Sequence, residues 1–243
     1  MKSSVTSVSA KGPANYTVPT FLCGLAVFVG GISVALIAWW GGNYSGGFGW
    51  EEPELQFRWH PVLMNFGMIF CQGNSIILYR TFRYVRKPYL KFIHGALHVL
   101  SCACTVVGFL AVLLSHINAH PPLPDFKSIH SWLGSAVIAL YLFQTIFSIL
   151  VFGFPGFPPA WRAKIMPIHR FMGIFLFVTS YGVAMAGLCE RQAFKMTCWT
   201  KEGYICEEMF IMNLYGCSAF LYVALVLGIV IQIDWARTPL HND

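Results

Sequence analysis

Residues 57–80 read FRWHPVLMNFGMIFCQGNSIILYR. After His60 the segment is mostly apolar, and it ends at Arg80, with Arg83 and Arg86 close behind. A bilayer core about 30 Å thick is crossed by an α-helix of about 20 apolar residues. The segment is therefore predicted to cross a membrane, with an imidazole at one end and a cluster of arginines at the other.

The rest of the chain has the same character. Of its 243 residues, 56% are hydrophobic and 11% are charged, whereas soluble domains carry about 25% charged residues. Six long apolar stretches lie at about 19–40, 60–79, 92–115, 129–152, 168–189 and 208–233. Soluble helices would need charged outer faces, which these stretches lack. We therefore predict an all-α membrane protein with six transmembrane helices in the lipid bilayer, forming one domain over residues 1–243.

Lysine and arginine distinguish the two sides of the predicted membrane domain. They cluster at the termini and in the second and fourth links, as Lys2, Lys11, Arg80, Arg83, Arg86, Lys87, Lys91, Arg162, Lys164, Arg170 and Arg237. By the positive-inside rule, these parts are predicted to face the cytosol and the other links the lumen or cell exterior. The net charge of +6 reflects this asymmetry and does not indicate nucleic-acid binding. A plasma membrane and an endomembrane vesicle or lysosome all fit.

Histidines recur at matching depths in four of the stretches. His60 and His130 stand at outer helix ends, while His169 and either His94 or His98 stand at inner ends. Two facing imidazoles can hold one flat macrocycle as axial ligands to haem iron, and bundle cores accommodate such cofactors. A zinc site fits less well because neither pair has a third and fourth ligand. We therefore predict two b-type haems in a central four-helix bundle of helices two to five.

Four motifs carry these histidines: the opening segment, KFIHGALH (91–98), SIHSWLG (128–134) and MPIHRFMG (166–173). In order and spacing they resemble the cytochrome b561 family, as do YSGGFGW (44–50) and GLCER (187–191). The resemblance covers nearly the whole chain. It implies electron transfer from cytosolic ascorbate through two haems b to an acceptor across the membrane. It also implies that His94 and His169 hold the inner haem, and His60 and His130 the outer one.

A cytosolic donor site has a physical rationale, since ascorbate is an anion. Lys87 and Lys91 lie four residues apart at the start of the third helix, which puts them on one helix face, and Arg162 precedes the fifth helix. All three match positions that contact ascorbate in the family. Arg80 and Lys87 resemble contacts to the inner haem. The alternative is that these basic residues serve only topology and lipid headgroups.

On the outer side the resemblance assigns further residues. The residues that resemble the family's contacts to the edge of the outer haem are Asp125, Phe126, Lys127, Ser128 and Glu190. His116 matches a position that meets the acceptor, which is a ferric chelate in reductase members. His120 follows in HINAHPPLP, so the two imidazoles either hold a metal ion transiently or are solvated loop residues.

Several points stay open in the sequence. Asn43 stands where some family members have a histidine, and Ala236 stands where a lysine is often found. These departures leave the identity of the acceptor open between ferric iron and monodehydroascorbate. A non-catalytic haem-binding sensor or a transporter is the alternative from another functional class. Family members are commonly homodimers, which no residue here predicts. Cys198 and Cys206 share the fifth link, where a disulfide and two free thiols are about equally expected.

Overall fold

A computed structural model describes residues 17–44 and 46–237, and across these residues the chain is helical, without strands. Six helical segments are long and apolar enough to cross a membrane: Thr17–Asn43, Pro53–Thr81, Lys87–Asn118, Ile129–Gly153, Pro159–Lys195 and Glu207–Ile231. The predicted six-helix membrane fold is therefore confirmed. Lys2 and Lys11 lie outside the described residues.

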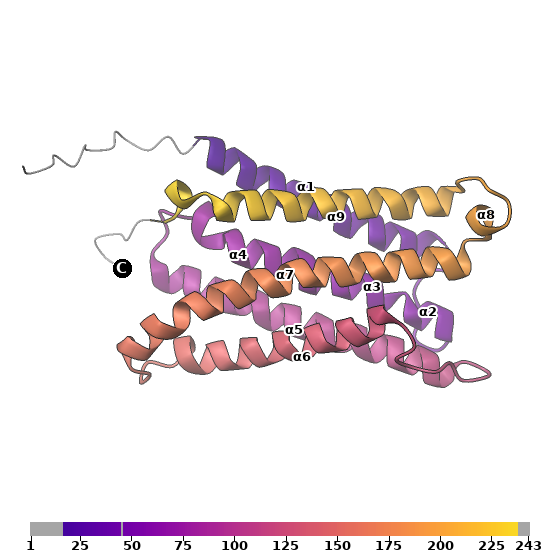
Figure 1. Cartoon of the computed structure of the whole chain (residues 1–243), viewed down its shortest axis with the longest axis horizontal. Helices are drawn as coiled ribbons and strands as arrows, with labels where there is room; N and C mark the ends of the chain where they lie inside the picture. The colour runs from indigo at the N-terminus through magenta and orange to yellow at the C-terminus, as the bar shows by residue number, and fades with distance from the viewer. Residues whose placement is uncertain (1–16, 45, 238–243) are drawn as a thin grey trace, which may run out of the picture.

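The helices run roughly along one direction, and Figure 1 shows them side by side. The first span is α1 (Thr17–Asn43), the third is α5 (Lys87–Asn118), the fifth is α7 (Pro159–Lys195) and the sixth is α9 (Glu207–Ile231). The fourth consists of α6 (Ile129–Ser148) and the π-helical turn η2 (Ile149–Gly153). The third and fifth spans extend beyond the predicted apolar stretches, because a helix satisfies its own backbone and can continue past the bilayer.

The second span is divided into several segments. They are α2 (Pro53–Phe57), α3 (Trp59–Met64), the π-helix η1 (Asn65–Cys71) and α4 (Gln72–Thr81). A π-helix bonds residue i to i+5, so it changes the phase between the turns on either side. Asn65, at its start, is buried and accepts a hydrogen bond from Tyr215 at 3.4 Å. Its amide nitrogen lies 3.4 Å from the Ser33 hydroxyl, so the polar side chain is satisfied by α1 and α9.

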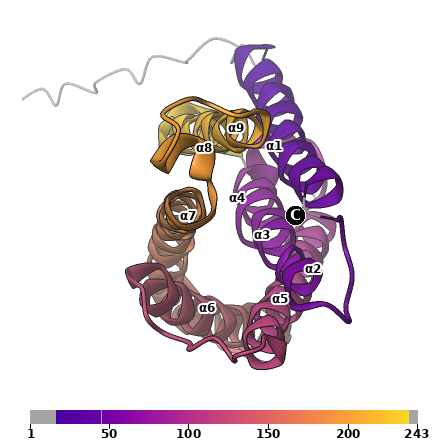
Figure 2. The same ribbon diagram turned by 90° about the vertical axis from the view of Figure 1, so that its right-hand side faces the viewer.

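Spans two to five surround a central space, while α1 and α9 pack together outside it. Figure 2 shows this ring of α3, α5, α6 and α7 from its end. The outer pair is joined to the ring by a buried cluster that includes Cys23 of α1, Ile77 of α4, Phe177 of α7 and Tyr222 of α9. This is the predicted central four-helix bundle.

Close packing of α1 depends on glycine at one position. A Cβ atom on Gly30 would lie 2.8 Å from ring atoms of both Phe70 and Tyr222, which is too close for real side chains. Tyr222 in turn donates a hydrogen bond to the carbonyl of Phe70 at 3.0 Å. Gly30 therefore allows three spans to meet at this depth.

The links between spans contain short structured elements. Ser128 caps the start of α6, where its side chain accepts from Ser131 N and the Ser131 side chain accepts from Ser128 N. Between α7 and α9 lies α8 (Thr197–Thr200), and Cys198 is disulfide-bonded to Cys206. The structure thus resolves the open alternative for these two cysteines in favour of a disulfide. The 3₁₀-helix η3 (Ile233–Trp235) follows α9.

Candidate functional site

One histidine pair lies near the end of the bundle where α3 and α6 begin. The ring centroids of His60 on α3 and His130 on α6 are 6.1 Å apart, at an interplanar angle of 90°. The Nδ1 atom of His60 donates to the Gly108 carbonyl at 3.1 Å, and that of His130 to the Val183 carbonyl at 2.8 Å. Because carbonyl oxygens only accept, the proton must sit on Nδ1, which leaves Nε2 as a metal-ligating atom.

A second pair lies towards the opposite end of the bundle. His94 on α5 and His169 on α7 also have ring centroids 6.1 Å apart, at 66°. The Nδ1 atom of His94 lies 3.1 Å from the Ser75 carbonyl and 2.7 Å from the Ser75 hydroxyl. That of His169 lies 3.0 Å from the Ser148 hydroxyl. The two pairs are separated by about 20 Å, since Ser75 follows His60 by fifteen residues along the second span.

The separation within each pair suits two axial ligands on one metal. A metal–imidazole bond is about 2 Å long, and a ring nitrogen lies about 1 Å from its ring centroid, so two opposed imidazoles have centroids about 6 Å apart. Both pairs show 6.1 Å. No group of three or more potential metal-binding side chains occurs within residues 17–44 and 46–237, so neither pair has the donor set of a tetrahedral zinc site. The residues present fit a flat macrocycle that supplies the other four ligands.

The pair His60–His130 borders a cavity of about 760 Å³. Small residues make room there: a Cβ atom on Gly187 of α7 would lie 2.6 Å from the His130 ring. A smaller cavity of about 150 Å³ lies beside His169 and Ser148 at the other end. The larger volume falls within the range of cofactor sites, about 300–1,000 Å³.

His98 lies next to the second pair without belonging to it. Its ring centroid is 4.6 Å from that of His94, and its Nδ1 atom is 2.7 Å from the Tyr141 hydroxyl. The ring contact with His169 is made by His94. The geometry therefore favours His94 over His98 as the ligand on α5.

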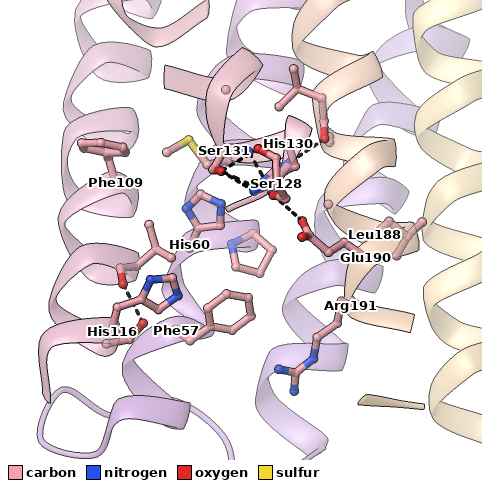
Figure 3. A pocket seen from close by; sticks show the side chains of 18 of the residues that line it. Phe57, His60, Phe109, His116, Ser128, His130, Ser131, Leu188, Glu190 and Arg191 are labelled. Atoms are coloured by element: carbon pink, nitrogen blue, oxygen red, sulfur yellow. Dashed lines mark hydrogen bonds between the residues drawn. The ribbon is translucent and has the colours of Figure 1, made fainter. Parts of the chain in front are cut away.

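The outer-edge residues predicted from the sequence gather around the larger cavity. Its lining includes Asp125, Phe126, Lys127, Ser128 and Glu190 together with both histidines. Figure 3 shows Ser128, Glu190, His60 and His130 around this space. The Ser128 hydroxyl donates to the Glu190 carboxylate at 3.0 Å, which connects the start of α6 to the end of α7.

His116 and His120 also line this cavity. The Nδ1 atom of His116 is 2.7 Å from the Asp125 carboxylate, so the carboxylate fixes how the ring is oriented. That of His120 lies 2.9 Å from the carbonyl of Ala119, its own neighbour in the chain. The two imidazoles are thus held by different partners.

The predicted donor-site residues lie at the other end of the molecule. Lys87 and Lys91 are exposed in the first turns of α5, and Arg162 is half-buried in the first turn of α7. These helix starts lie at the same end of the bundle (Figure 1). Arg162 donates to the Phe154 carbonyl at 2.7 Å. Arg80 donates to the carbonyls of Val230 and Gln232 at the end of α9, so its guanidinium is engaged with that helix.

The sequence reasoning did not find the groups that orient the ligands. Ser75, Ser148 and the carbonyls of Gly108 and Val183 gave no recognisable signal, because each meets its histidine from another span. Arg58, two residues before His60, was also passed over although it is fully buried. Arg58 lies just outside the predicted span 60–79 but inside the helical span Pro53–Thr81 that the structure shows, so the predicted boundary hid it.

The fold and the site define a helical membrane protein of six spans with two histidine pairs inside a four-helix bundle. The model of the eukaryotic cytochrome b561 family matches residues 59–195. The chain belongs to the cytochrome b561 family.

Several relatives are similar over most of their length. A putative transmembrane ascorbate-dependent reductase CYB561 homolog of Caenorhabditis elegans is 36% identical over 226 residues, covering 88% of this chain and 83% of that protein. Transmembrane ascorbate-dependent reductase CYB561 of Mus musculus is 37% identical over 237 residues, with 98% and 90% covered. Plasma membrane ascorbate-dependent reductase CYBRD1 of Rattus norvegicus is 33% identical over 215 residues, with 87% and 74% covered.

Proposed function

We propose that the protein is a transmembrane reductase that carries electrons from cytosolic ascorbate, through two b-type haems, to an acceptor on the opposite side. The observation that carries this proposal is the pair of histidine pairs at opposite ends of one bundle, each with centroids 6.1 Å apart. The names of the relatives, which are ascorbate-dependent reductases, support the donor. Membership of the cytochrome b561 family supports haem as the cofactor.

In this proposal His60 and His130 hold the outer haem, and His94 and His169 the inner one. Each bound haem supplies a centre that accepts and releases single electrons. The protein orients the four imidazoles by engaging their Nδ1 atoms.

At the cytosolic end, Lys87, Lys91 and Arg162 are proposed to bind the ascorbate anion. Charge-assisted contacts to an anionic ligand are stronger than neutral ones, and exposed lysines can reach a ligand that arrives from solution. Arg80 and Lys87 are proposed to contact the inner haem, with Arg80 placed there through its bonds to the end of α9. The orientation, with both termini in the cytosol, follows from the positive-inside rule.

At the outer end, the acceptor is proposed to approach the edge of the outer haem site, which Asp125 through Ser128 and Glu190 form in the wall of the 760 Å³ cavity. Because Nδ1 of His116 donates its hydrogen bond to Asp125, Nε2 of His116 is left to meet the acceptor. A ferric chelate would bind through that nitrogen as a metal ligand, and monodehydroascorbate through a hydrogen bond. The homodimer, and the choice between plasma membrane and an internal vesicle or lysosome, remain predictions.

An absorption spectrum of the purified protein tests the proposed function. We expect the bands of bis-histidine haem b, which change on addition of ascorbate and return when an oxidant is added. Haem bands that do not respond to ascorbate would favour a sensor, and a protein purified without haem bands would contradict the proposal.

The acceptor site leads to a prediction for His116→Ala. We expect reduction of ferric citrate outside to slow by roughly tenfold, which corresponds to about 1.4 kcal/mol from one lost contact. Reduction of both haems by ascorbate inside should not change, because His116 is not a proposed haem ligand and lies at the opposite end of the bundle from the proposed ascorbate site. Vesicles loaded with ascorbate allow both rates to be measured.

His120→Ala is the matched control, since it removes another imidazole from the same cavity wall. An unchanged ferric citrate rate in the His116 variant would show that iron is not handled there. Monodehydroascorbate would then be the better assignment for the acceptor.

A further inference from the structure

Arg58 is a fully buried cation at the outer end of the second span, between α2 and α3. Its side chain has 0% relative exposure. Among residues 17–44 and 46–237, none supplies a hydrogen-bond partner to its Nε, Nη1 or Nη2 atom. A guanidinium stays protonated in proteins, so the position carries a permanent positive charge. Burying such a charge is unfavourable unless its surroundings compensate for it.

The compensation comes from an aromatic ring and a carboxylate beyond it. The Arg58 guanidinium carbon lies 4.6 Å from the ring centroid of Trp40 on α1, within cation–π range. The indole Nε1–H of Trp40 donates to the Glu208 carboxylate at 2.9 Å. Trp40 therefore stands between the cation and the acid, and Arg58 is not neutralised by direct ion pairing.

The neighbouring Arg191 offers a contrast. It also lies near the Trp40 ring, at 5.6 Å, and near the Phe57 ring, at 5.3 Å. However, its Nη1 atom lies 3.5 Å from the Glu54 carboxylate, which in turn binds Lys195 at 3.0 Å. Arg191 thus forms an ion pair with Glu54, whereas within residues 17–44 and 46–237 no carboxylate lies within ion-pair distance of Arg58, which interacts with Glu208 and Glu54 only at longer range.

Arg58 lies close to the outer histidine pair but faces away from it. His60 follows by two residues, which turns it about 200° around the helix. The aromatic rings on the cavity side connect the two: Trp40 and Phe57 line the 760 Å³ cavity with His60, and Phe57 lies 6.1 Å from the His60 ring. Figure 3 shows Phe57 beside His60, with Arg191 nearby. Trp40, which contacts the Arg58 guanidinium, is thus part of the cavity wall, and apolar surroundings screen a charge poorly.

We propose that Arg58 raises the reduction potential of the outer haem. The inference rests on the proposed binding of that haem by His60 and His130. One added electron lowers the charge of the iron centre by one, so a fixed cation nearby stabilises the reduced form over the oxidised form. The charge of Arg58 thereby favours movement of the electron from the inner to the outer level. Arg58 is not among the residues that line the cavity, so it acts on the haem through its charge.

Potentiometry of the purified protein, followed by haem absorbance, tests this role. For Arg58→Gln we expect about a tenfold lower ratio of reduced to oxidised outer haem at a fixed potential. For a one-electron couple this corresponds to a midpoint potential that is about 59 mV lower. Arg58→Lys keeps the charge and should restore most of the potential. Glu208→Gln keeps an oxygen acceptor for Trp40 but removes the negative charge, so it should shift the potential upwards. Lys201→Gln, in an exposed link, is the control for a remote cation.

The inner haem provides an internal reference, because its potential should change little in all four variants. An Arg58→Gln protein with unchanged haem spectra and an unchanged outer potential would overturn the proposal. If that variant does not accumulate, Glu208→Gln decides, and an unchanged or lowered outer potential there would overturn it. Absence of haem from the parent protein would instead contradict the proposed function, so the two failures are distinguishable.

Discussion

Replacing His94 or His169 with alanine is expected to remove one of the two haems from each chain. In the proposed function each imidazole would supply one of the two protein ligands of its haem, and its partner alone would leave one axial position empty. The outer haem should remain and should still be reduced by dithionite, because its ligands lie about 20 Å away along the bundle. Haem content per chain, measured after extraction, gives the result directly.

The outer pair should behave in the same way, with His60→Ala or His130→Ala removing only the outer haem. His98→Ala is the matched control, because the ring centroid of His98 lies 4.6 Å from that of His94, yet His98 is hydrogen-bonded to the Tyr141 hydroxyl. It should retain both haems. Full haem content in any of the four ligand variants would refute that residue as a ligand, and loss of a haem in the His98 variant would revise the assignment on α5.

The second large effect is expected at the proposed cytosolic donor site. Lys91→Ala should raise the ascorbate concentration needed for haem reduction by about ten- to hundred-fold, because a charge-assisted contact contributes about 1.5–3 kcal/mol. Both haem spectra should be unchanged, since Lys91 is not a ligand. Added salt should weaken ascorbate reduction in the parent protein, because Lys91 is exposed and its charge is screened.

Lys164→Ala is the matched control for this prediction. Lys164 is an exposed lysine on α7 near the same end, and its ammonium lies 5.4 Å from the Trp161 ring centroid. Its removal should leave the ascorbate dependence near that of the parent. A triple variant of Lys87, Lys91 and Arg162 to alanine with unchanged ascorbate dependence would contradict the donor site and leave topology as the role of these residues.

The spans and the histidine pairing were predictable because both depend on short patterns. A membrane helix shows itself as a long apolar run, and the depth of a histidine such as His60 follows from its distance to the end of that run. The six spans are confirmed, and the ring separations are those that the predicted pairing requires. The roles of these histidines as haem ligands stay predictions until haem content is measured.

Other features depend on contacts between distant segments and left no local pattern. The π-helix η1 interrupts a run that reads as an ordinary apolar helix, and it accompanies the contacts of Asn65 with α1 and α9. The bond between His116 and Asp125 requires the third link to fold back onto the end of α5. The environment of Arg58 is made by Trp40 and Glu208 from the first and last spans. Sequence spacing within one span contains no information on such neighbours.

Electron transfer across a sealed membrane tests the central proposal most directly. The protein is reconstituted in liposomes that contain ascorbate, with ferric citrate or monodehydroascorbate supplied only outside, and vesicles lacking protein serve as the blank. A second control is the His94→Ala protein in matched vesicles. It should transfer no electrons from internal ascorbate to the outside acceptor, although its outer haem is present. We predict reduction of an outside acceptor at the expense of internal ascorbate in the parent vesicles. Haem that is reduced by internal ascorbate while every outside acceptor remains oxidised would contradict a transmembrane reductase.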